Sequence, residues 1–225
     1  MEYANSGCLS DEINKNWENL KKSLSIYYFP ENRVWKILTQ ITLGLYYLHS
    51  KDIIHRDIKP GNILIFDSTY VKITDFGATR QLRPGELNAA TEIGTSEFSA
   101  PETLDFEYNQ KSDIWSLGVT IYNLCTTSFP LGLTKDGKHH IRASLHNKLP
   151  IKMDNMDKYS LSLQQLILQM LTFEPEKRIS AEQILKHPKI SSLIKPCIVR
   201  KKLICLKNHK LKFMIPKSQI NRKPE

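Results

Sequence analysis

A chain of 225 residues with 40% hydrophobic and 24% charged residues suits one large globular domain and a tail, and no apolar run approaches the ~20 residues that span a bilayer. Ten Lys or Arg and one Glu lie in residues 191–225, so this segment carries the whole net charge of +9 and residues 1–190 are neutral. Four cysteines without a CxxC pair or zinc spacing, and no signal peptide, argue against a disulfide-rich secreted protein and predict a reduced intracellular one, cytoplasmic or nuclear.

The first part of the chain predicts two helices and a hairpin. Residues 1–10 are typical of a strand end that runs into a turn, and a polar helical stretch follows to about Leu24. Pro30 suits the first turn of a stronger helix, because apolar residues then recur on one face at helical spacing: Val34, Ile37, Leu38, Ile41, Leu45 and Leu48. The apolar runs at 63–65 and 71–73 flank a turn signal and predict a small β-hairpin.

The middle of the chain alternates loops with one central helix. Residues 76–99 are polar and predict a long functional loop. Residues 111–126 are apolar on nearly every side, which predicts a helix at the domain centre. Residues 130–158 are predicted to be loop-rich, with one short helix near 140–146.

Two further helices are expected at 161–172 and 180–187, the second with Ser180 as N-cap and Gln183 completing a capping box. The basic segment 191–225 predicts a flexible tail. It is either solvated without a specific partner or attracted to acidic proteins, nucleic acid or anionic lipid, and nucleic acid is not expected as its main ligand.

Two segments carry the candidate chemistry: HRDIKPGN at residues 55–62 and DFG at 75–77. A lone DFG tripeptide is a weak signal because tripeptides recur by chance. The two segments together, in this order and at this separation, are the pattern that phosphoryl transfer with magnesium requires.

Each residue type in the two segments suits one task of phosphoryl transfer. Asp57 can accept the proton of an attacking hydroxyl as general base, and Lys59 can reach the transferred phosphate. Asn62 offers a neutral oxygen and Asp75 a charged one, which are the hard ligands that magnesium prefers.

These motifs resemble those of eukaryotic protein kinases, and the similarity extends over residues 1–190, where APE at 100–102 and DIWSLG at 113–118 also match. Lysine at 59 followed by PGN resembles the serine/threonine type, and the segments 30–37 and 44–50 resemble NIMA-related kinases. The resemblance implies an α+β fold, predominantly α, with a small β-hairpin at the catalytic cleft. It divides the chain into hinge (1–10), C-terminal catalytic lobe (11–190) and basic tail (191–225).

The resemblance also implies ATP and Mg²⁺ as cofactors and proteins bearing Ser or Thr as substrates. Met1 falls at the gatekeeper position, the backbones of Glu2 and Ala4 would face adenine, and Leu64 would form the apolar floor beneath that base. Cys8 falls near the ribose position, although a small turn residue serves there equally well. Lys59 would contact the phosphate.

Catalytic and regulatory roles follow from the same resemblance. The hydroxyl of Thr95 would bridge Asp57 and Lys59. Arg56 would receive a phosphate from the activation loop, with Thr91 as the acceptor, unless Thr91 is an unmodified loop residue.

Other matched residues would be structural. Glu102 is expected to form a buried ion pair with Arg178, and Asp113 to brace the backbone at His55 and the residue after it. Phe76 is expected to be exposed, because in the family it packs beneath an N-terminal lobe that does not precede the motifs here.

No glycine-rich loop and no strand lysine precede residue 55, which leaves three interpretations open. The sequence is a truncated record of an active kinase, or a catalytically inactive lobe that serves as a binding module or decoy, or one half of a pair whose other chain supplies the N-terminal lobe.

Overall fold

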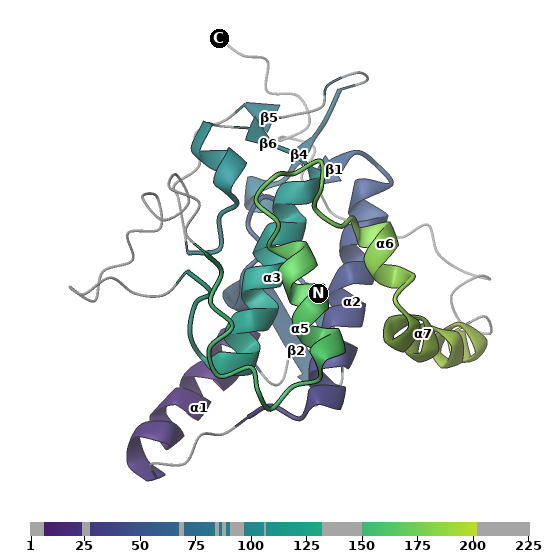
Figure 1. Cartoon of the computed structure of the whole chain (residues 1–225). Helices are drawn as coiled ribbons and strands as arrows, with labels where there is room; N and C mark the ends of the chain where they lie inside the picture. Colours follow the sequence, from purple (N-terminus) through teal and green to yellow (C-terminus); the bar gives the residue numbers. More distant parts are fainter. Residues whose placement is uncertain are drawn as a thin grey trace.

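The computed structural model describes residues 7–23, 28–67, 70–83, 86, 89–90, 97–105, 107–131 and 150–201. Within these ranges the fold is mostly helical with short antiparallel strand pairs, which confirms the predicted α+β class. Figure 1 shows α2, α3 and α5 side by side at the centre of the molecule, with α1 beneath α3. The predicted short helix near 140–146 lies outside the described residues.

The two predicted N-terminal helices form as α1 (Leu9–Ser23) and α2 (Glu31–His49). Pro30 precedes α2 with an extended backbone, and its carbonyl accepts the first helical hydrogen bonds, from the amides of Arg33 and Val34. The predicted apolar face of α2 is buried: Val34, Ile37, Leu38, Ile41, Leu45 and Leu48. Burial of this stripe explains why a helix with few capping bonds is stable.

The central helix is α3 (Gln110–Thr126), and it is buried on nearly all sides as its composition predicts. Asn109 caps its first turn, and Ser112 completes the capping box. Gly118 permits close contact with α5 (Leu161–Met170), because a Cβ at this position would lie 3.0 Å from atoms of Met170 and Leu171. The helix thus lies at the centre of the hydrophobic core.

Three strand pairs flank this core among the residues that the structure describes. The predicted hairpin forms from β2 (Ile63–Asp67) and β3 (Tyr70–Ile73). Two shorter pairs join β1 (Ile53–Ile54) to β4 (Arg80–Gln81) and β5 (Ala89–Ala90) to β6 (Glu107–Tyr108). The expected continuous loop at 76–99 is therefore wrong in part. Two-residue strands show no periodicity, so only the distant partner strand reveals them.

The described residues end with α6 (Ala181–Leu185) and α7 (Pro188–Lys201). The predicted capping box of α6 is confirmed, since Ser180 Oγ accepts from the Gln183 amide and Gln183 Oε1 accepts from the Ser180 amide. The boundary expected at residue 190 falls inside α7, so the chain continues as helix beyond it. No helix among the described residues has the length and apolar character needed to cross a membrane.

Candidate active site

The loop that carries Asp57 is attached to α3 through one buried carboxylate. Asp113 accepts the backbone N–H of His55 at 2.9 Å and that of Arg56 at 2.9 Å, which confirms the expected bracing. Arg56 has a left-handed backbone, with φ 68°, and the two hydrogen bonds stabilise this conformation. The central helix therefore determines where the loop presents Asp57.

A second histidine, His49, was not predicted to take part in the site. Its Nε2 lies 2.8 Å from Asp113 Oδ2, and both side chains are buried. The only indication of this role in the sequence is that His49 places a polar side chain at the end of the buried face of α2. Burial alone would raise the pKa of Asp113, but the hydrogen bond of His49 and the backbone hydrogen bond of His55 hold that pKa below its usual value.

His55 links the two sequence motifs. Its Nδ1 accepts the backbone N–H of Asp57 at 3.3 Å, so the ring proton sits on Nε2, which donates to the carbonyl of Thr74 at 3.1 Å. Burial lowers the pKa of His55 and favours this neutral form. The ring of Phe76 packs edge-to-face on His55 with centroids 5.3 Å apart. Phe76 is therefore half-buried, and the expectation that it is exposed was wrong, because His55 covers one side of its ring.

Lys59 and Asn62 both donate a hydrogen bond to the same carboxylate oxygen of Asp57. Asp57 Oδ2 accepts from Lys59 Nζ at 2.8 Å and from Asn62 Nδ2 at 2.8 Å. The Asn62 amide nitrogen also donates to the Asp57 carbonyl at 2.8 Å. Asp57 keeps 25% of its side chain exposed, so this carboxylate is held in place by two donors and still faces solvent.

The hairpin brings Asp75 to the same place. Ile63 pairs with Ile73, so Asn62 lies opposite Thr74, and the Thr74 amide donates to the Asn62 carbonyl at 2.9 Å. Asp75 follows in a left-handed conformation, with φ 60°, and its Oδ1 accepts the Gly77 amide at 3.3 Å. The carboxylate of Asp75 is exposed at the end of the hairpin that carries Asn62.

Of the residues expected near the adenine and ribose of a nucleotide, the structure describes Cys8 and Leu64. Cys8 forms a β-bridge with Leu64, and the Ile65 amide donates to the Gly7 carbonyl at 2.9 Å, so the segment before α1 lies along β2. Leu64 is half-buried, and the Cys8 thiol donates to Asp11 Oδ2 at 3.1 Å. Met1, Glu2 and Ala4 lie outside the described residues.

The guanidinium of Arg56 uses only some of its N–H donors within the part of the chain that the structure describes. Its Nε donates to the Ala78 carbonyl at 2.5 Å and its guanidinium lies 5.8 Å from the ring centre of Tyr108. Among the residues that the structure describes, its buried Nη1 has no hydrogen-bond partner. Burial and the charge of Arg80 lower the pKa of Arg56. Thr91 and Thr95 lie outside the described ranges.

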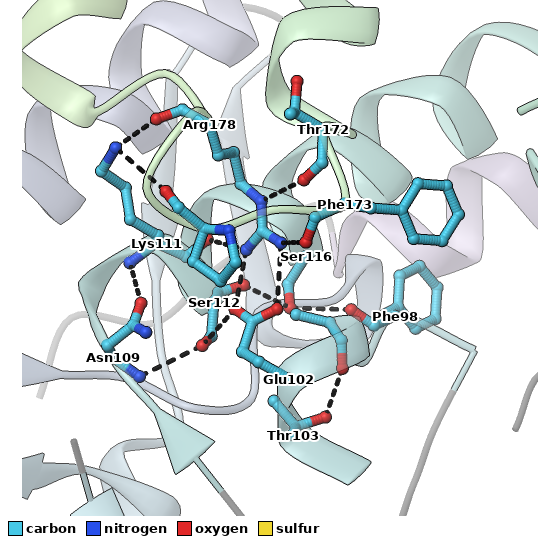
Figure 2. A network of polar contacts seen from close by, with 12 residues as sticks. Phe98, Glu102, Thr103, Asn109, Lys111, Ser112, Ser116, Thr172, Phe173 and Arg178 are labelled. Atoms are coloured by element: carbon cyan, nitrogen blue, oxygen red, sulfur yellow. Dashed lines mark hydrogen bonds and ion pairs between the residues drawn. The ribbon is translucent and has the colours of Figure 1, made fainter. Parts of the chain in front are cut away.

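The expected ion pair between Glu102 and Arg178 forms, and Figure 2 shows the network around it. Arg178 donates from Nη1 to Glu102 Oε1 at 2.7 Å and from Nη2 to Glu102 Oε2 at 2.9 Å. It also donates to three backbone carbonyls, those of Lys111 at 2.8 Å, Thr172 at 2.8 Å and Phe173 at 3.1 Å. All five guanidinium N–H groups are thus satisfied in the interior.

Comparison with known proteins gives a consistent family. The protein kinase domain family matches residues 1–190. The chain is 33% identical over 202 residues to human serine/threonine-protein kinase Nek2. The aligned region covers 86% of this chain and 43% of that protein. It is 36% identical to serine/threonine-protein kinase pakG of Dictyostelium discoideum (92% of this chain, 17% of that protein). It is 35% identical to human ribosomal protein S6 kinase alpha-2 (79% and 25%).

The chain therefore spans less than half the length of these relatives. The similarity to Nek2, and to mouse Nek3 at 33% identity, confirms the resemblance to NIMA-related kinases. Together with the convergence of Asp57, Lys59 and Asn62, the match over residues 1–190 shows that the chain belongs to the protein kinase domain family.

Proposed function

We propose that this protein transfers the γ-phosphoryl group of ATP to serine or threonine hydroxyls of protein substrates. The observation that carries the proposal is the single carboxylate oxygen, Asp57 Oδ2, on which Lys59 and Asn62 converge at 2.8 Å each. A carboxylate positioned by two donors and still open to solvent suits a base that receives a substrate hydroxyl.

The proposed reaction uses the residues in separate roles. Asp57 accepts the hydroxyl proton while the hydroxyl oxygen bonds to the γ-phosphorus and the bond to the bridging β-phosphate oxygen breaks. Lys59 lies beside Asp57 and stabilises the negative charge on the transferred group. Thr95 is proposed to support both residues through its hydroxyl.

The residues present fit magnesium with few protein ligands. Both hydrogen bonds that hold Asn62 to Asp57 use its amide nitrogen, which leaves the carboxamide oxygen for a cation, and Asp75 adds an exposed carboxylate. The described part of the chain contains no group of three or more His, Cys, Asp or Glu side chains able to hold a metal. This suits Mg²⁺, which takes few ligands from protein and the rest from phosphates and water. When bound, the ion neutralises phosphate charge.

Nucleotide binding and regulation complete the proposal. Cys8 and Leu64, bridged in the structure, are assigned to the ribose and the base, with the neighbouring segment of Met1, Glu2 and Ala4. The buried Arg56 nitrogen, which has no hydrogen-bond partner among the described residues, is suited to a phosphate on Thr91. The proposed setting is intracellular, and an acidic protein is the proposed partner of the basic segment 191–225.

Substitutions at two carboxylates test the proposal. With ATP, Mg²⁺ and a mixture of Ser and Thr peptides, Asp57→Asn should abolish ³²P transfer while nucleotide affinity, measured by calorimetry, stays near that of the parent chain. Asp75→Asn should instead weaken nucleotide binding only when Mg²⁺ is present. Transfer by the Asp57→Asn protein at the parent rate would show that the assigned base is wrong.

The same assay separates the enzyme from a binding module. If the 225-residue chain binds ATP and transfers no phosphate, this chain is a catalytically inactive module or decoy, or a piece of a longer kinase. If it gains transfer only when a separate chain that contains an N-terminal kinase lobe is added, the two-chain interpretation holds.

A further inference from the structure

His187 lies immediately before α7, at the position from which a side chain can cap the first turn of a helix. Its Nδ1 accepts the backbone N–H of Lys189 at 3.3 Å, and its carbonyl accepts the backbone N–H of Ser191 at 2.8 Å. Pro188 follows at the first helical position, where a missing N–H has no cost. His187 is therefore the N-cap of α7, a place where Ser, Thr, Asp and Asn are preferred.

The contacts of the imidazole ring determine which of its nitrogens carries the proton. Nδ1 accepts an amide hydrogen, so the neutral ring carries its proton on Nε2, which lies 3.1 Å from Ser162 Oγ of α5. The ring is also stacked on Trp35 of α2, with centroids 5.0 Å apart and 24° between the planes. A proton added at Nδ1 would point at the N–H of Lys189 and abolish the cap, whereas the contact with Ser162 would persist.

The charges beside His187 in the chain oppose a protonated ring. Lys186 precedes His187 and Lys189 follows two residues later, and the start of a helix carries a positive partial charge. The helix α5 has no charged residue, and the one acid of α6, Glu182, pairs with Lys186 at 2.7 Å. A positive charge on the ring would therefore meet other positive charges.

The carboxylate of α2 nearest to the ring is already engaged. Glu31 lies one turn before Trp35, and its Oε1 accepts from the Trp35 indole at 2.8 Å and from Ser160 Oγ at 2.6 Å. Its Oε2 accepts the Ser160 amide at 2.9 Å. Burial lowers the pKa of His187, which agrees with a ring that is neutral when it caps the helix.

The turn that His187 caps also contains the residue that fixes α7 to the core. Ile190 is 0% exposed, and Leu193 and Ile194 on the same face are partly buried against the core. Figure 1 shows α7 following α6, and α7 packs against α2. The basic segment 191–225 begins within α7. The stability of this first turn therefore affects how firmly the segment is attached to the fold.

We propose that His187 is a proton-sensitive cap, which holds the first turn of α7 when neutral and releases it when protonated, so that the basic segment is held less firmly in mildly acidic solution. The folded pKa lies below the unfolded value of about 6.5, so the unfolded turn binds the proton first. The stability that the cap provides is thus present above about pH 6.5 and falls as pH drops through the folded pKa. The inference does not depend on the proposed function, because its residues lie away from Asp57.

Hydrogen exchange at single amides of the full chain, measured by NMR at about pH 7.5 and about pH 5.5, tests the proposal on both sides of the ordinary histidine pKa. Protection factors remove the intrinsic effect of pH on exchange. The amides of Lys189, Ile190 and Ser191 should lose about fivefold in protection at the lower pH, the size expected for the loss of an N-cap. The Gln183 amide, capped by the hydroxyl of Ser180, is the internal control and should keep its protection.

Three variants separate the cap from the other contacts of the ring. His187→Asn keeps a capping oxygen that cannot take up a proton, so the protection of residues 189–191 should be the same at both pH values. His187→Ala should show reduced protection at both. Ser162→Ala removes the partner of Nε2 and leaves Nδ1 in place, so it should lose protection at low pH as the parent chain does.

The outcomes leave a clear decision. Equal protection of residues 189–191 at both pH values in the parent chain, or a loss that persists in His187→Asn, would overturn the inference. A loss of the same size at Gln183 would show general loosening of the fold and would also count against it. If His187→Asn does not fold, the midpoint of the loss in the parent must match the NMR titration of the His187 ring, and a mismatch would refute the cap. None of these results depends on phosphate transfer.

Discussion

The pair of Glu102 and Arg178 gives the sharpest test of how this fold is held together. The change is Glu102→Gln, which keeps size and shape but removes the charge that faces Arg178. The side chain of Arg178 is 0% exposed and that of Glu102 8% exposed, so solvent cannot replace the lost carboxylate. Breaking a buried ion pair by removing one partner typically costs ~3–5 kcal/mol in the free energy of unfolding.

The structure also predicts how a double substitution behaves. Replacing a buried ion pair by two apolar residues is often neutral, because both charges leave together. Here Arg178 also donates to the carbonyls of Lys111, Thr172 and Phe173, which Glu102→Leu with Arg178→Met would leave without their donors. Each unsatisfied buried carbonyl costs about 1–3 kcal/mol. The double variant should therefore be no more stable than Glu102→Gln.

The assay is urea unfolding followed by helical circular dichroism, with unchanged m-values as the condition for comparing midpoints. Glu182→Gln provides the matched control, because Glu182 pairs with Lys186 at 2.7 Å on an exposed helical surface. This control should leave the midpoint unchanged within error. A Glu102→Gln protein as stable as the control, or a double variant that regains parental stability, would refute the reasoning.

Three further outcomes follow from local features. The fold lowers the pKa of Asp113, so the stabilising effect of this carboxylate is fully present above its unfolded pKa of about 3.9. The effect is lost as pH falls through the lower folded pKa. Urea midpoints of the parent and Asp113→Asn proteins should therefore converge below about pH 4. Gly118→Ala should destabilise by about 1 kcal/mol, because overpacking by a Cβ 3.0 Å from atoms at the end of α5 outweighs the ~1 kcal/mol that Ala gains over Gly in a helix. Gly44→Ala, which meets only the far end of a β3 side chain, should cost less in the same urea series. Burial raises the pKa of Cys125, so peptide mass spectrometry should find Cys8 alkylated and Cys125 unmodified in the native protein, and labelling of both at equal rates would contradict this.

Prediction from the sequence succeeded where the interacting groups are close along the chain. The capping box of Ser180 and Gln183, which the sequence predicted, spans three residues. Asp57, Lys59 and Asn62, which were given separate roles from the sequence, lie in contact within five residues. Such short separations leave the backbone few ways to place these groups apart. The pairing of Glu102 with Arg178 spans 76 residues and was anticipated only from the family resemblance.

Contacts between distant segments without a family pattern escaped prediction. His49 and Asp113 are 64 residues apart, and a histidine at the end of an apolar helix gives no indication of its partner. Phe76 was expected to be exposed, and His55 covers it because the loop of the first motif folds over the second. The strand pairs β1–β4 and β5–β6 are too short to show an alternating pattern.

The amino-acid sequence by itself determined the types of chemical group at the site and their order in two loops, since a short motif carries its own geometry. Only the tertiary structure decided which surfaces meet. A cavity of about 470 Å³ beside Lys59 is lined by four separate segments, namely α1, residues 59–61, Phe98 and the end of α3, and only packing brings them together. The physical reason is that local hydrogen bonds depend on neighbouring residues, whereas a cavity depends on how helices distant in sequence pack against each other.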